Sequence, residues 1–250
     1  MRFAIDSDDD ERSTMDLKGV ELTWLGHAAI RLRLTDGTVL LIDPWLSGNP
    51  ACPDAEQEQE RVDAVYLTHG HFDHIGSTRE IAGQHEPQIF AIHEIAVYLE
   101  GIGVGNVVGS NKGGTVVGPG DVAATLVDAV HSSGLSGDDG IVPGGEAAGW
   151  VLAVPEGPTV YHAGDTAVFG DMALIGELWS PDLALLPIGG HYTMGPVHAA
   201  RAAELLGVSA VVPIHYGTFP ILAGTPAEFA TALQGTRIEM VEAEAGVPIH

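Results

Sequence analysis

A run of seven residues holds four side chains that commonly bind metal ions: Thr68-His69-Gly70-His71-Phe72-Asp73-His74. Imidazole and carboxylate groups together are the usual ligands of zinc and similar metals. The run follows directly after the apolar residues 65–67, and Gly70 permits the chain to turn sharply so that these side chains converge. The alternative is a polar turn that happens to be rich in histidine, but the mixture of imidazole and carboxylate favours a metal site.

Three more ligand-type residues follow apolar, β-branched runs further along the chain: His131, Asp165 and His215. Side chains that leave the ends of neighbouring strands can meet at one edge of the sheets. With the first run they make five histidines and two aspartates, namely His69, His71, Asp73, His74, His131, Asp165 and His215. These seven ligands are too many for one tetrahedral zinc with an open position, and they suit two metals with one bridging carboxylate.

The pattern of apolar residues predicts the elements that must position these ligands. Strands are predicted at 21–25, 29–34, 39–42, 62–68, 88–92, 150–154, 159–162, 183–187, 210–214 and 237–241, with several more within 106–130. Helices are predicted at 75–84, 93–101, 168–178, 196–206 and 226–234. Segments 44–61 and 132–149 are rich in turn-forming residues and are predicted to be long functional loops. Strands first and strand–helix units later predict two packed sheets with helices outside, an α/β (α+β) fold.

The length allows one large domain or two small ones, and the order of predicted elements favours one. The chain has 250 residues; residues 1–18 are predicted to be a flexible acidic leader, and residues 19–250 a single domain. The leader lacks the apolar core of a secretory signal, and no apolar run approaches the roughly 20 residues of a membrane span, so a cytoplasmic location is expected. Cys52 is the only cysteine, which excludes an intrachain disulfide and fits a reducing compartment.

The charge balance is strongly acidic. Lys and Arg number 10 against 34 Asp and Glu, which gives a net charge of -24 at pH 7. This field repels a polyanion, so a nucleic-acid partner is not expected. A small-molecule substrate is expected, a membrane partner is not, and a homo-oligomer stays open. Adaptation to high salt and a high-GC genome would both explain the acidity, and the sequence does not separate them.

The run at 68–74 resembles the HxHxDH signature of the metallo-β-lactamase superfamily, and the resemblance covers nearly all of residues 20–242. The later ligand positions of that superfamily resemble His131, Asp165 in Ala163-Gly164-Asp165-Thr166, and His215 in Pro213-Ile214-His215-Tyr216-Gly217-Thr218-Phe219. The stretches Gly26-His27-Ala28-Ala29 and Leu186-Pro187-Ile188-Gly189-Gly190 look most like one branch. It holds uncharacterised metal-dependent hydrolases related to the ascorbate-phosphate lactonases and the N-acylphosphatidylethanolamine phospholipase D enzymes.

The resemblance implies a four-layer αββα sandwich and a site for two divalent metal ions. Zinc is the favoured metal, with manganese or iron as alternatives. By resemblance, the first metal is held by His69, His71 and His131, the second by Asp73, His74 and His215, and Asp165 bridges the two. Members that reduce oxygen or nitric oxide carry a glutamate where this chain has His71, so the resemblance implies hydrolysis.

The expected reaction is attack by a bridging hydroxide on a small water-soluble ester, lactone, amide or phosphodiester. Asp165 is expected to orient the nucleophile and His191 to protonate the leaving group. Two alternatives stay open: a non-catalytic metal-binding or sensor protein, and a phosphodiesterase-like or nuclease-like enzyme. The absence of a basic stripe disfavours the nuclease.

Four further residues have weaker signals. His27 stands at a strand end from which it can approach the site, and Asp43 ends a strand from which it can orient a ligand histidine. His162 is predicted to face the core from a strand, and His198 to lie on a helix without a role in the chemistry. Arg79 is the only cation near the main run and offers a thin basis for binding phosphate.

Overall fold

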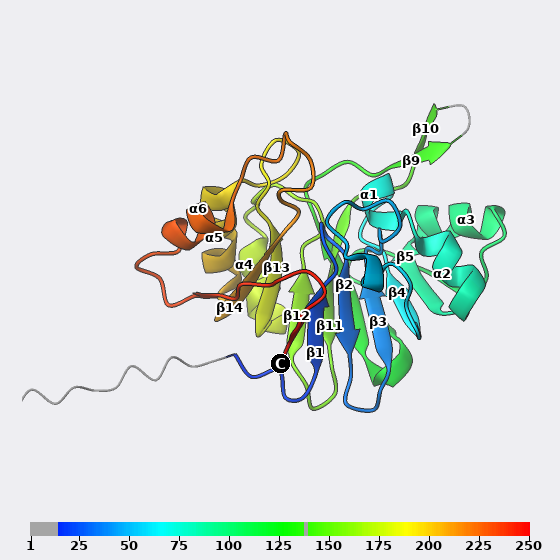
Figure 1. Ribbon diagram of the computed structural model, residues 1–250, viewed down its shortest axis with the longest axis horizontal. Coiled ribbons are helices and arrows are strands. Elements are labelled where there is room, and N and C mark those ends of the chain that lie inside the picture. Colours follow the sequence, from blue (N-terminus) through cyan, green and yellow to red (C-terminus); the bar gives the residue numbers. More distant parts are fainter. Residues whose placement is uncertain (1–14, 138–139) are drawn as a thin grey trace, which may run out of the picture.

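Two seven-stranded sheets face each other in the computed structural model, which describes residues 15–137 and 140–250 (Figure 1). The first sheet has the order β16 (Pro248–Ile249), β1 (Glu21–Trp24), β2 (Ile30–Arg33), β3 (Val39–Ile42), β4 (Ala64–Tyr66), β5 (Gln88–Ile92) and β6 (Val107–Ser110). The second has the order β15 (Glu239–Met240), β14 (Ala210–Ile214), β13 (Leu183–Pro187), β12 (Thr159–His162), β11 (Ala148–Ala153), β8 (Ala123–Asp128) and β7 (Thr115–Val117).

Helices cover the outer face of each sheet (Figure 1). Beside the first sheet lie α1 (Phe72–Ile75), α2 (Thr78–His85) and α3 (His93–Gly101), and beside the second lie α4 (Met172–Trp179), α5 (Pro196–Leu206) and α6 (Pro226–Ala232). Short 3-10 turns occupy Asp54–Glu56 and Pro119–Asp121. This arrangement confirms the predicted αββα sandwich.

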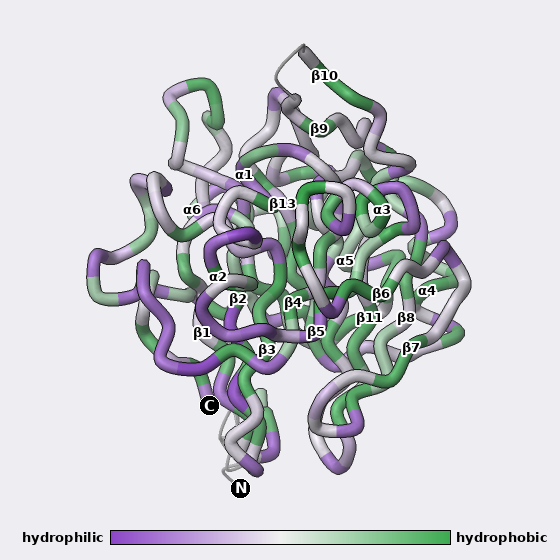
Figure 2. Tube along the Cα trace, turned by 90° about the vertical axis from the view of Figure 1, so that its right-hand side faces the viewer, coloured by the Kyte–Doolittle hydropathy of each residue, from purple (hydrophilic) through white to green (hydrophobic). Residues whose placement is uncertain are grey.

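The inner strands β11 to β14 of the second sheet are buried on both faces, as the alternation along β13 shows. Leu183 and Leu185 belong to the core between the sheets, whereas Ala184 and Leu186 belong to the core under α4 and α5. Such a strand needs apolar residues at every position, which explains the continuous apolar run in its sequence. In Figure 2 the hydrophobic residues concentrate on the central strands and the hydrophilic ones on the surrounding loops.

The packed region includes part of the predicted leader. Leu17 is buried in the core between the sheets, and Met15 packs against it. The predicted leader boundary at residue 18 therefore lies inside packed structure, while residues 1–14 of that leader lie outside the described residues. The extent of the single domain predicted for 19–250 stays a prediction. Within the described ranges, no helix combines the length and the apolar character needed to cross a lipid bilayer.

The helix predicted at 75–84 is in fact two helices, α1 and α2, separated at Gly76 and Ser77. Ser77 Oγ accepts hydrogen bonds from the backbone N–H groups of Leu46 and Ser47, at 2.9 and 3.1 Å. A Cβ at Gly76 would lie 2.9 Å from Trp45 Cδ1. The break lies where a loop distant in sequence contacts the chain, and local periodicity carries no sign of it.

The segment 132–149, predicted to be a functional loop, contains a hairpin. Its strands are β9 (Gly134–Gly137) and β10 (Gly140–Pro143), and they form a two-stranded sheet that projects beyond α1 (Figure 1). β11 also begins at Ala148, earlier than predicted. Glycines interrupt the apolar alternation that would have indicated these strands.

Candidate metal centre

The carboxyl ends of β4, β8, β12 and β14 bring the predicted ligands together at one edge of the two sheets. The donor atoms form two clusters of four, in each of which all atoms lie within 4.8 Å of one another, and a smaller group of Asp43, His69 and His74 overlaps both. The first cluster consists of His69, His71, His131 and Asp165, and the second of His27, Asp73, His74 and His215. All the candidate ligands named from the sequence are present, and His27 joins them.

Asp165 lies between the two clusters. Its Oδ2 is 3.1 Å from His215 Nε2 and 3.6 Å from His131 Nε2. Its Oδ1 is 3.3 Å from His74 Nε2. One carboxylate thus faces imidazoles of both clusters, which is the geometry required of a ligand shared by two metals.

Unpaired buried atoms show that the centre fits metal ions. His74 Nε2, His215 Nε2 and Asp165 Oδ1 are buried, and none finds a hydrogen-bond partner among the described residues. Leaving a buried polar group without a partner costs about 1–3 kcal/mol. Nitrogen and carboxylate donors that point at one another across a few ångströms are satisfied together by divalent cations.

Asp43 fixes the orientation of two candidate ligands. It is fully buried, and its Oδ2 accepts a hydrogen bond from His74 Nδ1 at 2.7 Å, which confirms the predicted contact with a ligand histidine. The same carboxylate accepts from Thr68 N at 2.8 Å and from Thr68 Oγ1 at 2.6 Å. Since the hydroxyl proton of Thr68 is engaged with Asp43, its oxygen accepts from His69 Nδ1 at 3.0 Å. In both histidines Nδ1 carries a proton, and Nε2 is directed to the centre.

The backbone of Gly70 is not left-handed, so this position does not need glycine for its conformation. It needs glycine for space, because Leu135 packs close to it. A Cβ at Gly70 would lie 3.0 Å from Leu135 Cδ2. The Gly70 N–H donates to Ser133 Oγ at 3.1 Å, and that hydroxyl donates to the Gly144 carbonyl at 3.0 Å. The ligand run is thereby attached to both ends of the β9–β10 hairpin.

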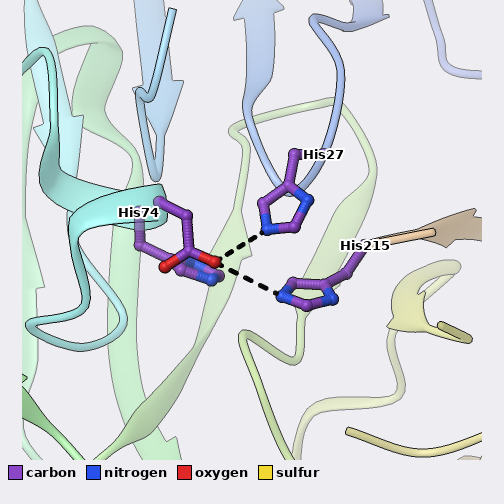
Figure 3. A group of neighbouring side chains, drawn as sticks. His27, His74 and His215 are labelled. Carbon is purple, nitrogen blue, oxygen red and sulfur yellow. Dashed lines mark hydrogen bonds and ion pairs between the residues drawn. The ribbon is translucent and has the colours of Figure 1, made fainter. Parts of the chain in front are cut away.

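His27 contacts a carboxylate of the second cluster directly. His27 Nε2 lies 3.0 Å from Asp73 Oδ2, and because a carboxylate only accepts, the imidazole donates this bond. Thr218 Oγ1 lies 2.9 Å from Nδ1 on the other side of the ring. Figure 3 shows His27 and His215 converging on the same carboxylate, with His215 Nε2 at 3.8 Å from Asp73 Oδ2. The sequence marked His27 only as a residue near a strand end, and its partner Asp73 could not be read from it.

Burial keeps most of the candidate imidazoles neutral in the metal-free protein. It lowers the pKa of His69, His71 and His131, and the neutral form is the one that binds metal. Burial acts in the same direction on His74, but the carboxylates around it, Asp165 first, outweigh burial and raise its pKa well above the usual value. In the metal-free protein the proton on His74 occupies a place that a metal would take.

The carboxylates of the centre stay ionised. Burial would raise the pKa of Asp165, but the neighbouring histidines, His215 first, hold it well below the usual value. Burial would also raise the pKa of Asp73, but the hydrogen bond from His27 and nearby histidine charges lower it to about 2. Burial lowers the pKa of His27 to about 4, so at neutral pH this ring is an uncharged donor to Asp73.

A cavity of about 950 Å³ opens above the clusters. Its lining consists of the candidate ligands His71, Asp73, His131, Asp165 and His215, the polar or small residues Ser132, Ser133, Gly134 and Ser136, and the apolar or aromatic residues Phe72, Ile141, Pro143, Tyr192, Phe219 and Ile221. Both loops predicted to be functional border this region, since the hairpin lies within 132–149 and Trp45 packs against Phe72.

Other residues singled out from the sequence lie away from the centre or at its edge. His191 is exposed, and the cavity is lined by its neighbour Tyr192, so its role in proton transfer stays a prediction. His162 is buried in β12 as predicted, with its Nε2 2.9 Å from the Ala28 carbonyl oxygen. His198 is exposed on α5, and Arg79 is exposed on α2 without lining the cavity.

Replacing His27 by alanine is expected to weaken binding of one metal of the pair by about 10–100-fold, because Asp73 loses the group that holds its carboxylate. Metal titration against a competing chelator measures this directly. His27→Gln keeps a donor within reach of Asp73 and is expected to restore part of the affinity. His198→Ala removes an exposed imidazole and serves as the control; equal losses in both alanine variants would contradict the role of His27.

Comparisons with known proteins found a matching family model and several relatives. The family model described as "Beta-lactamase superfamily domain" matches residues 38–216. A UPF0173 metal-dependent hydrolase of Koribacter versatilis is 54% identical over 214 residues, which is 86% of this chain and 91% of that protein. One from Methanopyrus kandleri is 46% identical over 229 residues, which is 91% of this chain and 98% of that protein.

A solved structure has a similar fold over nearly the full length. The metallo hydrolase Igni18 of the hyperthermophilic archaeon Ignicoccus hospitalis matches with a TM-score of 0.80 at 38% sequence identity. The match covers 92% of this chain and 97% of that one. The likeness therefore extends over both sheets.

Proposed function

The chain belongs to the metallo-β-lactamase superfamily and is a metal-dependent hydrolase, and on this premise we propose that it works with two divalent metal ions on a small water-soluble ester, lactone, amide or phosphodiester. The observation that carries the proposal is the position of Asp165, whose two oxygens face imidazoles of both clusters. A carboxylate in that place can bind two metals at once.

The proposed ligands follow the two clusters. His69, His71 and His131 hold the first metal, Asp73, His74 and His215 hold the second, and Asp165 is shared between them. Zinc is the proposed metal because nitrogen donors dominate the set, with manganese or iron as alternatives. His27 supports the second metal through its hydrogen bond to Asp73.

Different residues of the chain have different proposed roles in catalysis. When bound, the metals would supply a hydroxide at neutral pH and polarise the oxygen of the scissile group. Asp165 orients the nucleophile, and Asp43 and Thr68 hold the imidazoles of the candidate ligands in place. His191 is proposed to give the leaving group its proton from the loop that also places Tyr192 at the cavity.

A metal analysis combined with a substrate panel tests this function. Two metals per chain together with turnover of an ester or phosphodiester panel is the expected result. Two bound metals without turnover on any panel would favour the rival, a metal-binding sensor. The presence of the whole predicted ligand set in one place supports the enzyme over that rival.

We also propose a cytoplasmic location, which fits a chain whose only cysteine is Cys52. Cys52 is buried, and burial raises its pKa to about 11, so its thiol is a poor nucleophile. A homo-oligomer stays a prediction that sedimentation can measure.

A further inference from the structure

The apolar side chains of the cavity gather at its mouth rather than in the core. Phe72, Tyr192 and Ile221 all line the cavity, with exposed fractions of 54%, 58% and 45%. Large apolar side chains in water bring no benefit to the fold, and clustered around a candidate active site they indicate a surface that a ligand covers. The candidate metal ligands lie next to them in the same cavity.

The β9–β10 hairpin presents one of its faces to this cavity. Ile141 pairs with Ser136 and Pro143 pairs with Gly134, and all of them line the cavity. The residues between them in sequence point to the other face, because side chains alternate along a strand. Ile141 is 85% exposed, the most exposed large apolar side chain in the described ranges. Figure 2 shows β10 as a hydrophobic segment at the edge of the molecule.

The described residues that line the cavity include no lysine and no arginine. Lys112 and Arg31 are engaged in ion pairs elsewhere, and Arg79 lies outside the cavity. A site for an anionic substrate normally offers such a cation for charge-assisted hydrogen bonds. The net charge of -24 also repels anions from the molecule as a whole.

Resting on the function proposed above, we propose that the substrate is an ester, lactone or amide that carries an uncharged apolar group. The acyl or alkyl chain of this substrate lies along Ile141, Phe72 and Ile221. Water adds its hydroxyl to the carbonyl carbon, the C–O or C–N bond breaks, and the remaining proton goes to the departing alcohol or amine. Phosphodiesters are expected to be the poorer substrates, because the described lining adds no cationic side chain to the charge of the proposed metals.

We call Ile141, Phe72 and Ile221 the apolar wall. A series of 4-nitrophenyl esters from acetate to hexanoate tests whether the wall binds the acyl chain. A fully buried methylene contributes about fourfold, and in a cavity that stays partly open we expect about twofold for each, so kcat/KM rises about sixteenfold over the four methylenes of the series. Mono-4-nitrophenyl adipate has the same six-carbon acyl chain with a carboxylate at its end, and it is expected to be at least about tenfold worse than the hexanoate.

Two variants on β10 test whether the dependence on chain length comes from the apolar wall or from any change in the hairpin. Ile141→Ser is expected to lower the ratio of hexanoate to acetate kcat/KM by about threefold. Val142→Ser is the matched control, because Val142 lies next in sequence on β10, is exposed, and does not line the cavity. It is expected to leave the ratio unchanged. Calorimetry on chelator-treated protein measures binding without turnover. There 2-octanone is expected to bind more tightly than 2-butanone. Ile141→Ser is expected to reduce this difference in affinity.

The outcomes distinguish the two proposals. Turnover of esters with no dependence on chain length, or with a preference for the adipate ester, overturns the apolar substrate and leaves the hydrolase standing. Absence of turnover with every ester, with a lactone and an anilide, and with bis(4-nitrophenyl) phosphate overturns the proposed function itself, while tighter binding of 2-octanone would still support the apolar wall.

Discussion

Asp165→Ala is expected to abolish turnover while the fold persists. The side chain is buried, lies between both clusters, and has no role in the core between the sheets. Without the shared carboxylate the two metals are no longer held together, and the loss of their joint effect is expected to lower kcat/KM about a thousandfold or more, which corresponds to about 4 kcal/mol. Measured metal content should fall below two per chain, and circular dichroism should keep its wild-type shape.

The control for this variant is Asp171→Ala, because Asp171 is an exposed carboxylate at the start of α4 and makes no capping hydrogen bond. It is expected to keep the metals and the activity. Asp165→Asn preserves the volume of the side chain but removes its charge, so it should behave like the alanine variant. Wild-type turnover with two metals in either substitution of Asp165 would end the case for a bridging carboxylate.

The sequence alone predicted the layers of the fold and the members of the site because both follow a local rule. Each strand is an apolar run, and His131, Asp165 and His215 follow such runs, so strand ends and ligands could be assigned together. Convergence at one edge then followed from the way neighbouring strands end.

The features that were missed depend on contacts between distant segments. The break between α1 and α2 lies at the contact with Trp45 and at the hydrogen bonds of Ser77, and neither is visible in the periodicity of residues 72–85. The role of His27 depends on the loop that places its carbonyl 2.8 Å from the His215 N–H and its ring against Asp73. Only the assembled loops show which of several histidines near strand ends reaches the centre.

Asp43→Ala is expected to damage both stability and metal binding. Three donors, Thr68 N, Thr68 Oγ1 and His74 Nδ1, lose their buried acceptor. Hydrogen bonds to a charged group contribute about 1.5–3 kcal/mol each, so the free energy of unfolding is expected to fall by about 4.5–9 kcal/mol. Urea unfolding measures this loss. Asp63→Ala is the control, since Asp63 accepts from Val39 N at 2.8 Å at the other end of β3 but is only partly buried, and about 1 kcal/mol is expected there.

Asp43→Asn separates the two effects, because asparagine fits the same space and tolerates the φ of 48° at this position. Its amide oxygen can still accept from Thr68 N, so most of the stability should survive. Its amide nitrogen, however, can only donate, and His74 Nδ1 would have to accept, which moves the imidazole proton to Nε2 where it faces Asp165 and blocks the metal. A well-folded protein with metal affinity reduced at least about 100-fold is therefore expected, and full metal affinity in this variant would show that Asp43 does not set the tautomer of His74.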